Sequence, residues 1–334
     1  MMATMKDVAQ LAGVSTATVS RALMNPEKVS SLTRKRVEDA VLETGYSPNA
    51  LTRNLRRNES KTIVVMIPNI TDPYFNDIIR GVEDTASDNG YVVLLCDNSQ
   101  SQSNSAAMSQ FLTKQADGIL LLGSDIHIDT SKSDQKALPP MAMACEYSPE
   151  LELPTVHIDN LTSAFEAVNY LTRMGHTRIA QISGPKDAAL CQFRHQGYQQ
   201  ALRRAGISLN ERHCISGDYS FESGSQAVRT LMRQPDAPTA IFCHNDVMAI
   251  GAMQELKKLG LQVPKDVSLI GFDDITFSAF CDPPLTTMSQ PRYEMGCQAM
   301  QILLSSLRGE EVANGSRLLD TNLVVRASVA PPKI

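Results

Sequence analysis

The chain has 334 residues, of which 43% are hydrophobic and 20% are charged, and its formal net charge is −5. This length exceeds one ordinary hydrophobic core, so two or three domains are expected. No apolar run approaches the roughly 20 residues that a membrane helix needs, and the first residues hold no apolar segment typical of a signal peptide. These features predict a cytoplasmic protein with no membrane partner.

Cysteine and histidine are scattered along the chain. The seven cysteines form no Cys-x-x-Cys pair, and the six histidines form no His-x-x-x-His pair. An odd, unclustered set of thiols indicates reduced cysteines rather than a disulfide framework or a zinc site. We therefore expect neither a metal nor a cofactor.

Charge is distributed unevenly. Residues 1–60 contain nine Lys and Arg against six Asp and Glu, a net charge of +3, whereas the rest of the chain contains 22 against 30, a net charge of −8. A basic N-terminal part on an acidic body is typical of a DNA contact confined to the N-terminus. The alternative is a chance fluctuation of a few charges, so the choice between it and a DNA contact depends on the sequence motifs.

The first 46 residues have the pattern of short helices. An apolar stripe that includes Val8 and Ala12 predicts a first helix, and Gly13 ends it because glycine readily adopts a positive φ. Ser15 is a favourable N-cap for a second helix that runs to about Leu23.

A third helix is predicted to begin after Ser30 or Ser31 and to end at Gly45. Two short helices joined by a glycine turn, the second with a small polar outer face, form a helix-turn-helix. Hydroxyl groups and Arg21 on that face can bond phosphates or base edges. A plain three-helix domain is the alternative.

The next segment, residues 47–61, is polar and contains Arg53, Arg56 and Arg57. Within it, residues 49–56 can form about two helical turns, which are marginal in water on their own. We expect this hinge to fold only when it docks on DNA and on a partner copy of the chain, and an inert tether is the alternative.

From Thr62 onward, short β-branched runs alternate with helical stretches. This alternation predicts parallel, doubly wound sheets covered by helices, and two sets of about five strands predict two lobes of similar size. The strands are expected at Thr62–Pro68, Tyr91–Asp97, Gly118–Leu122, Pro140–Cys145, Thr155–Asp159, Arg178–Ser183, His213–Gly217, Thr239–His244, Val267–Phe272 and Leu285–Ser289. The helices are expected at Phe75–Asn89, Leu161–Gly175, Arg194–Gly206, Ser223–Arg233 and Val247–Gly260.

A last helix and a last strand, Glu294–Leu307 and Asn322–Val325, are expected to cross back between the lobes, which suits a hinged cleft. The sequence thus predicts an all-α helix-turn-helix head (1–47), a hinge (48–61) and an α/β body of two doubly wound parallel-sheet lobes (62–334). The N-lobe is expected at about 62–160 plus 292–320, and the C-lobe at about 161–290 plus 321–330.

No motif in the sequence is typical of catalysis. Phosphate loops, dinucleotide-binding glycine motifs and nucleophile elbows are all missing, so an enzyme is not expected. Polar residues instead follow the predicted strands, at the sheet edge where ligands of parallel α/β proteins bind. Each alone is more often a helix cap or turn former, but together they favour a polar ligand in a cleft. They are Asn69, Asp72, Asp97, Ser124, Glu146, Asp159, Asn245, Asp246 and Asp273.

Several strings resemble the LacI/GalR family of bacterial repressors. In the head they are Met5-Lys6-Asp7-Val8-Ala9, Ala12-Gly13-Val14-Ser15, Thr18-Val19-Ser20-Arg21 and Gly45-Tyr46-Ser47-Pro48-Asn49-Ala50. In the body they include Asp72-Pro73-Tyr74-Phe75, Phe242-Cys243-His244-Asn245-Asp246, Gly271-Phe272-Asp273-Asp274 and Pro283-Pro284-Leu285-Thr286-Thr287. The resemblance spans essentially the full chain and implies a body with the fold of periplasmic sugar-binding proteins. One departure is Met24, where the family usually has Asn after the recognition helix.

The resemblance implies that a homodimer binds operator DNA through its heads and hinges. In this family the leucine that matches Leu55 wedges into the minor groove at the operator centre. The residues expected to contact DNA are Thr4, Ser15, Thr16, Ala17, Thr18, Ser20, Arg21, Lys28, Asn49, Thr52, Arg53 and Leu55.

The resemblance also implies an effector in the body. Arg194 and Asp273 match ligand-binding residues of the family, Tyr219 matches an aromatic ring that stacks on a sugar or base, and Phe75 lies near an N-lobe aromatic. The residues expected to contact the effector are Phe75, Ser124, Glu146, Asp159, Arg194, Tyr219, Asn245 and Asp273.

The chain is similar in particular to one member of the family that shares the Met24 departure. That similarity implies the pyrimidine nucleoside cytidine as effector, repression of nucleoside uptake and breakdown genes, and the cyclic-AMP receptor protein as a partner on DNA. Ala188 and Leu190 stand where a purine-binding member has Arg and Thr, which argues against a purine effector. The alternatives are a sugar-responsive repressor of the same family, a solute-binding protein without a DNA role, and a nucleoside-processing enzyme.

Overall fold

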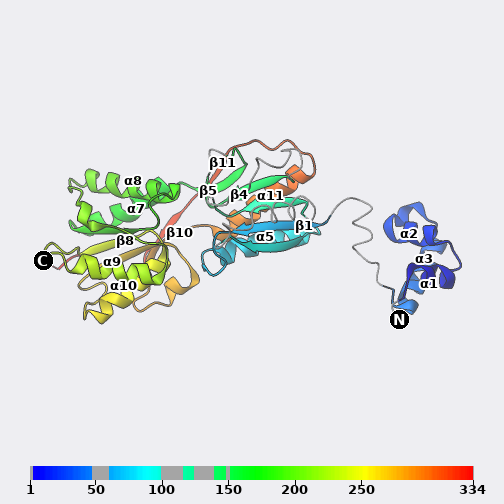
Figure 1. Cartoon of the computed structure of the whole chain (residues 1–334), viewed down its shortest axis with the longest axis horizontal. Helices are drawn as coiled ribbons and strands as arrows, with labels where there is room; N and C mark the ends of the chain where they lie inside the picture. The colour runs from blue at the N-terminus through cyan, green and yellow to red at the C-terminus, as the bar shows by residue number, and fades with distance from the viewer. Residues whose placement is uncertain (1–2, 47–59, 99–115, 124–138, 148–150, 334) are drawn as a thin grey trace. The chain divides into compact units, whose positions relative to one another are not determined.

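A computed structural model of the chain describes residues 3–46, 60–98, 116–123, 139–147 and 151–333. The chain divides into two compact units, residues 1–61 and 62–334, which we call the head and the body (Figure 1). Some residues predicted to contact DNA or effector lie outside the described ranges; they are Asn49, Thr52, Arg53, Leu55 and Ser124.

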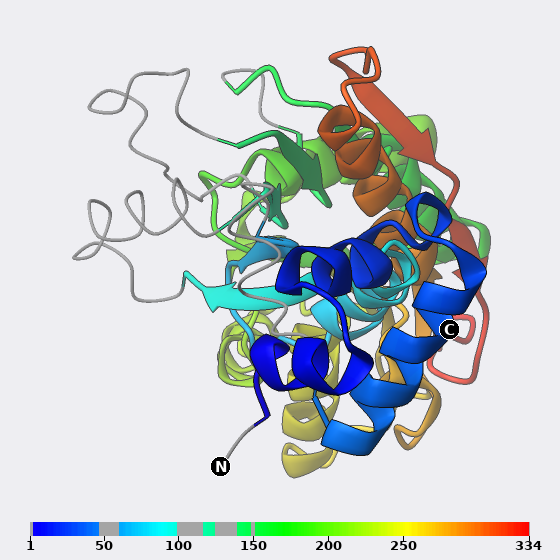
Figure 2. The same ribbon diagram turned by 90° about the vertical axis from the view of Figure 1, so that its right-hand side faces the viewer.

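The described part of the head contains α1 (Met5–Ala12), α2 (Thr16–Met24), the short 3-10 helix η1 (Pro26–Lys28) and α3 (Ser31–Thr44), all blue in Figure 2. Gly13 ends α1 with a φ of 64°, and Ser15 Oγ caps α2 by accepting a hydrogen bond from the Thr18 amide at 3.1 Å. Val19 and Val37 are fully buried in the small core that joins the helices. The predicted helix, glycine turn and second helix are confirmed.

The cap of α3 is Ser30 and not Ser31, because Ser30 Oγ accepts a hydrogen bond from the Thr33 amide at 3.3 Å. Loss of such a cap costs about 1 kcal/mol, so Ser30→Ala should lower the free energy of unfolding of the head by about that amount. Ser31→Ala, one residue further along, is the matched control and should change it by less than about 0.5 kcal/mol. Amide hydrogen exchange in the first turn of α3 of the full chain measures both, and equal protection in the two variants would contradict the assignment.

The body contains two six-stranded sheets. The first has the strand order β11-β5-β4-β3-β1-β2, and every pairing in it is parallel. Its strands are β1 (Thr62–Ile67), β2 (Val92–Asp97), β3 (Gly118–Leu121), β4 (Met141–Ala144), β5 (Thr155–Ile158) and β11 (Ser316–Leu319).

The second sheet has the order β12-β10-β9-β8-β6-β7 and is parallel except where β12 pairs antiparallel with β10. Its strands are β6 (Ile179–Ser183), β7 (Cys214–Ser216), β8 (Ala240–Cys243), β9 (Ser268–Asp273), β10 (Thr286–Ser289) and β12 (Asn322–Val324). The two predicted doubly wound lobes are confirmed.

Helices cover both sheets. In the second lobe α7 (Asn160–Arg173) and α8 (Ala189–Arg204) lie on one face of the sheet, and α9 (Phe221–Met232) and α10 (Asp246–Lys258) lie on the other (Figure 1). In the first lobe α5 (Phe75–Asp88) packs against α11 (Arg292–Leu307). Short 3-10 helices follow at η3 (Glu211–His213) and η4 (Thr276–Ala279).

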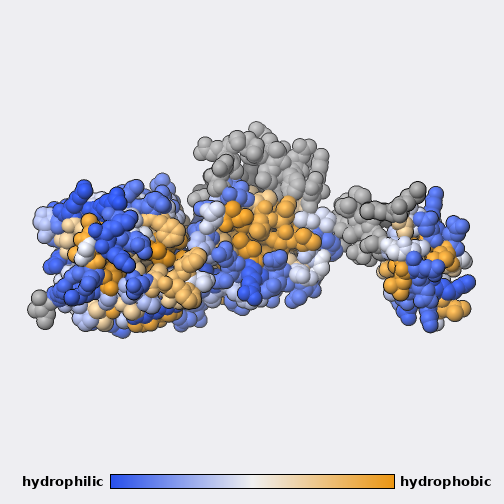
Figure 3. All heavy atoms as spheres, turned by 90° about the horizontal axis from the view of Figure 1, so that it is seen from below, coloured by the Kyte–Doolittle hydropathy of each residue, from blue (hydrophilic) through white to orange (hydrophobic). Residues whose placement is uncertain are grey.

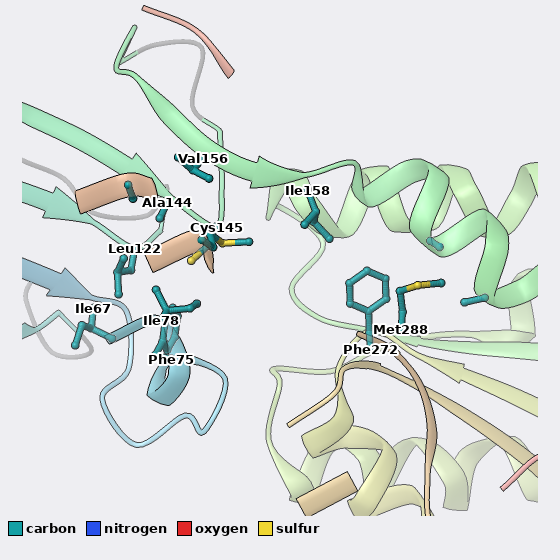
Figure 4. Packing of buried hydrophobic residues seen from close by; sticks show 14 of the residues in the cluster. Ile67, Phe75, Ile78, Leu122, Ala144, Cys145, Val156, Ile158, Phe272 and Met288 are labelled. Atoms are coloured by element: carbon teal, nitrogen blue, oxygen red, sulfur yellow. The ribbon is translucent and has the colours of Figure 1, made fainter. Parts of the chain in front are cut away.

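The chain passes between the lobes three times: from β5 into α7, from β10 into α11 and from β11 to β12. Figure 4 shows the facing sheet edges, with Ile67, Leu122 and Ala144 on the first lobe, and Phe272 on the second. Ile158 is the last residue of β5, directly before the chain passes into α7. Because the strands are parallel, their carboxyl ends meet at these edges, which is where a ligand cleft is expected.

The largest differences from the sequence prediction are one strand and one helix start, and other helices begin one or two residues from their predicted starts. Strand β11 was not expected, because Ser-Arg-Leu-Leu contains no β-branched residue and lies at an exposed sheet edge, where it pairs with β5. Helix α8 begins at Ala189 rather than Arg194, because its N-cap position, Ala188, carries no capping side chain that would mark it.

The surface of the body mixes polar and apolar areas. Figure 3 shows an apolar area on the lobe of the first sheet, and the edge strand β2 exposes Val92 to 68% and Leu94 to 39%. Within the described ranges, no helix combines the length and the apolar character that a membrane span requires.

Candidate functional site

A pocket of about 240 Å³ lies between the lobes of the body, at the carboxyl ends of their strands. The first lobe contributes Pro68, Asn69, Asp72, Tyr74, Phe75, Leu122, Gly123, Cys145 and Glu146. The second lobe contributes Pro185, Ala188, Leu190, Arg194, Asp218, Tyr219 and Asp273. Since both lobes line one cavity, any movement of one lobe against the other changes the shape of the pocket.

Arg194 is the cation of the pocket lining. It extends from α8 and is 5% exposed. Its Nε donates to Asn160 Oδ1 at 2.8 Å, its Nη1 donates to the His244 carbonyl, and its guanidinium carbon lies 3.7 Å from the centre of the Phe272 ring. Cation–π contact and two fixed hydrogen bonds hold the planar group in one orientation, which prepares it to donate to a ligand.

Tyr219 presents a fixed aromatic ring to the pocket. Its φ is 68°, and a side chain on Gly184 would lie 2.2 Å from the ring, so the ring packs directly on the Gly184 backbone. The hydroxyl lies 2.8 Å from Cys191 Sγ, and the Tyr219 carbonyl accepts from Asn245 Nδ2 at 3.2 Å. A ring fixed on one face in this way can stack on a planar ligand with the other.

Asp273 is a buried acid that lines the pocket. It is 4% exposed, has a φ of 110°, and its Oδ1 accepts from Gln290 Nε2 at 2.7 Å. Tyr74 donates to Gln290 Oε1 at 3.1 Å, so the carboxylate is linked to the first lobe through a residue on the segment between the lobes. Burial raises the pKa of Asp273 well above its ordinary value. A backbone held in a sparsely populated region is typical of a functional position.

The described lining of the pocket contains more carboxyl groups than cations. Its lining includes the four carboxyl side chains of Asp72, Glu146, Asp218 and Asp273, but Arg194 is the cation among the described lining residues. Burial raises the pKa of Asp72, whereas hydrogen bonds from Ser220 lower the pKa of Asp218. Such a lining suits a neutral ligand rich in hydroxyl or amine donors and disfavours an anion.

Five of the predicted effector contacts come together at the pocket: Phe75, Glu146, Arg194, Tyr219 and Asp273. Two others do not line it, because their oxygens cap helices. Asp159 is exposed, and its Oδ1 accepts from the Thr162 amide at 3.0 Å at the start of α7. Asn245 Oδ1 accepts from the Met248 amide at 2.9 Å at the start of α10, although its amide group also positions Tyr219.

Asp246 also has a structural role, because its side chain holds neighbouring segments together. It is fully buried, is not among the residues that line the pocket, and accepts from the Ile275 amide at 3.0 Å and from the hydroxyls of Ser278 and Thr287 at 2.6 Å each. These bonds tie α10 to β10 and to the segment after β9, and that segment follows directly after Asp273. Asp246 therefore shapes the pocket without lining it.

Sequence reasoning missed several lining residues. Tyr74 and Cys145 lie beside predicted residues, and Asp218 directly precedes Tyr219. For Asp218 and Tyr74 the neighbouring predicted residue is a usable signal. Cys145 has the same signal in its neighbour Glu146, but the thiol itself gives none, because a thiol at a strand end resembles an ordinary buried cysteine.

The outer face of α2 in the head carries the predicted DNA contacts. Thr16, Ala17 and Arg21 are exposed. The hydroxyls of Ser15 and Thr18 lie 2.9 Å apart within the cap of α2.

Two further predicted contacts lie near the helix ends of the head. Thr4 bonds Asp7 Oδ2 at 2.7 Å from both its amide and its hydroxyl, which fixes the start of α1. Lys28 is exposed at the end of η1. The face thus combines short side chains, hydroxyl groups and cations, which suits a DNA backbone and groove.

Two family models match the chain. The model of bacterial regulatory proteins, lacI family, matches residues 4–49. The model of periplasmic binding proteins and sugar binding domain of LacI family matches residues 60–319.

Individual proteins agree with these matches. The HTH-type transcriptional repressor CytR of Escherichia coli (strain K12) is 56% identical, over 98% of this chain and 96% of that protein. The ribose operon repressor of the same strain is 37% identical, over 91% of this chain and 92% of that protein. The crystal structure of the lac repressor dimer bound to operator and the anti-inducer ONPF has a TM-score of 0.86 at 28% identity, covering 99% of this chain and 100% of that one. The resemblance seen in the sequence is confirmed, and the chain belongs to the LacI family of bacterial regulatory proteins.

Proposed function

We propose that this effector-controlled, DNA-binding repressor acts as a cytoplasmic homodimer whose effector is the pyrimidine nucleoside cytidine. The observation that carries the choice of ligand is the pocket between the lobes, in which an aromatic ring, one arginine and four carboxyl groups converge. The similarity of the sequence to a cytidine-responsive member of the family supports the same choice.

The chemistry of a nucleoside fits these groups. The free face of Tyr219 stacks on the cytosine ring, and Asp273 and Glu146 accept hydrogen bonds from ribose hydroxyls or from the cytosine amine. Arg194 donates to the base carbonyl or to a ribose oxygen. Ala188 and Leu190 line the pocket without a donor or acceptor, so a purine would gain no polar contact from them.

Charge gives a sharp test of this ligand. Cytidine should bind the full chain, and cytidine monophosphate should bind at least about tenfold more weakly, because its phosphate would enter a pocket whose described lining has four carboxyl groups and one cation. Titration calorimetry with cytidine, cytidine monophosphate, adenosine and ribose measures this order. Heat with ribose but not with cytidine would instead favour a sugar-responsive repressor.

On DNA, two heads would read a two-fold operator, with the bodies setting their spacing. We assign the contacts to the face of α2 and, by resemblance, to Asn49, Thr52, Arg53 and Leu55 of the hinge. The cyclic-AMP receptor protein is the proposed partner, bound to DNA beside this repressor. Effector binding would change the affinity for DNA or for this partner by about 5- to 150-fold, the usual range of allosteric coupling.

Operator binding is tested by a gel shift of the full chain at increasing salt. The affinity should fall steeply, because each phosphate contact releases counterions. Turnover of cytidine during the same incubation would contradict a non-catalytic role, and an affinity independent of salt would contradict the DNA contact.

A further inference from the structure

We infer that Met24 reads the 5-methyl group of a thymine in the operator. Met24 is the position at which the chain departs from the Asn usual in its family, and the proposed function gives it no role. The inference rests on the proposed operator binding and adds to it a residue that determines base specificity.

The first observation is a hollow of about 420 Å³ on the outer face of α2. It lies between Met5 of α1 and the side chains of α2, and it exists because Thr16, Ala17 and Ser20 are short. A base edge can therefore approach the backbone of α2 closely at this point. Arg21, Met24 and Asn25 complete the lining.

The second observation is that Met24 does not belong to the core of the head. Fully or partly buried apolar residues of all three helices build that core, and they include its sequence neighbour Leu23 and also Met5. Met24 is half-buried but is not part of that cluster, and its side chain lines the hollow instead. An apolar side chain that lines such a hollow gains free energy when an apolar group covers it and removes its surface from water.

The major groove offers one such partner. Among the four bases only thymine presents a methyl group there, and apolar side chains recognise it by contact. Met24, Met5 and Ala17 supply the apolar atoms of the hollow, and the flexible thioether of methionine adapts to the exact position of the methyl group. An asparagine at residue 24 would supply an amide, which suits a phosphate or an adenine edge instead.

The position of Arg21 refines the inference. Arg21 and Met24 are three residues apart on α2, so they lie on one face about 4.5 Å apart along the axis. Base pairs are spaced about 3.4 Å apart. Because 4.5 Å corresponds to between one and two base pairs and Arg21 is suited to guanine, each half-site should contain a guanine one or two base pairs from the thymine read by Met24.

The experiment removes the methyl group from DNA rather than the side chain from the protein. A duplex selected by the full chain from a randomised pool is resynthesised with each thymine of a half-site replaced in turn by deoxyuridine. At one position the loss of the methyl should weaken binding about fourfold, the effect of one buried methyl-sized group. 5-Bromodeoxyuridine at that position, whose bromine is about the size of a methyl, should restore binding.

The protein arm uses Met24→Ala, with Leu42→Ala as the matched control, because Leu42 is an exposed apolar residue on α3. Met24→Ala should reduce the deoxyuridine penalty at that one position to below about twofold, whereas Leu42→Ala should leave it unchanged. Two results would overturn the inference while leaving operator binding intact. One is a scan with no sensitive thymine, and the other is a sensitive thymine whose penalty is the same in Met24→Ala.

Discussion

Arg194→Met should remove the response to cytidine while the chain still binds its operator. Arg194 donates to Asn160 and to the His244 carbonyl and packs on the Phe272 ring, so its guanidinium is oriented before any ligand arrives. Truncation of a buried, hydrogen-bonded charge at a binding site costs about 2–5 kcal/mol. We therefore expect the affinity for cytidine to fall by about 100-fold, which calorimetry on the full chain measures.

The matched control is Arg203→Met, because Arg203 lies on the same helix and is exposed. It should bind cytidine as the unchanged chain does. Arg194→Lys keeps the charge but loses the planar group, so it should recover only part of the affinity. Cytidine binding by Arg194→Met within about threefold of the unchanged chain would show that Arg194 does not contact the ligand.

Asp246→Ala should be the most destabilising of the changes considered. Its carboxylate accepts from Ile275, Ser278 and Thr287, and the substitution leaves all three donors buried without an acceptor. Each unsatisfied buried donor costs about 1–3 kcal/mol, so we expect a loss of about 3–5 kcal/mol and a fall in Tm of about 10 °C. Differential scanning calorimetry or thermal circular dichroism of the full chain measures this change.

The burial of Asp246 explains why the hydrogen bonds that its carboxyl oxygens accept matter for stability. Burial raises the pKa of this carboxyl to about 6, while the three hydrogen bonds act in the opposite direction and favour the ionised form. Asp246→Asn retains one acceptor oxygen and should lose less stability than Asp246→Ala. Asp88→Ala, an exposed position at the end of α5, is the control and should stay within about 0.5 kcal/mol. An equal Tm for the alanine variants at 246 and 88 would contradict the structural role.

Local patterns accounted for the head and for most elements of the body. Gly13 and Gly45 adopt the positive φ expected at helix ends, and Ser15 caps α2 as predicted. The bounds predicted for the strands that begin at Thr62 and at Arg178 differ from those of β1 and β6 by a residue or two. Helix caps and helix-ending glycines depend on contacts between residues about four positions apart or fewer, so a short window of sequence contains both partners of each contact.

The pocket could be predicted only in part, because the same residue types serve two purposes. Asp159, Asn245 and Asp273 all lie at or just after the ends of strands, but the first two use side-chain oxygens to cap helices and only Asp273 lines the cavity. A strand-end carboxylate or amide has the same chemistry in either role. The direction of the backbone after each strand decides between them, and no short sequence window contains that direction.

The sequence by itself determined the division into a helical head and a two-lobed α/β body, the glycine turn and cap of α2, and the family. Only the tertiary structure decided which groups meet at the pocket. Tyr74 reaches Gln290 across 216 positions of sequence, and Cys191 meets Tyr219 across 28. The first contact exists because the chain passes three times between the lobes and brings the carboxyl ends of two parallel sheets together, and the second exists because α8 and the segment before α9 meet within the second lobe. Periodicity and capping act over one or two helical turns, so they contain no information about which distant strand ends face each other.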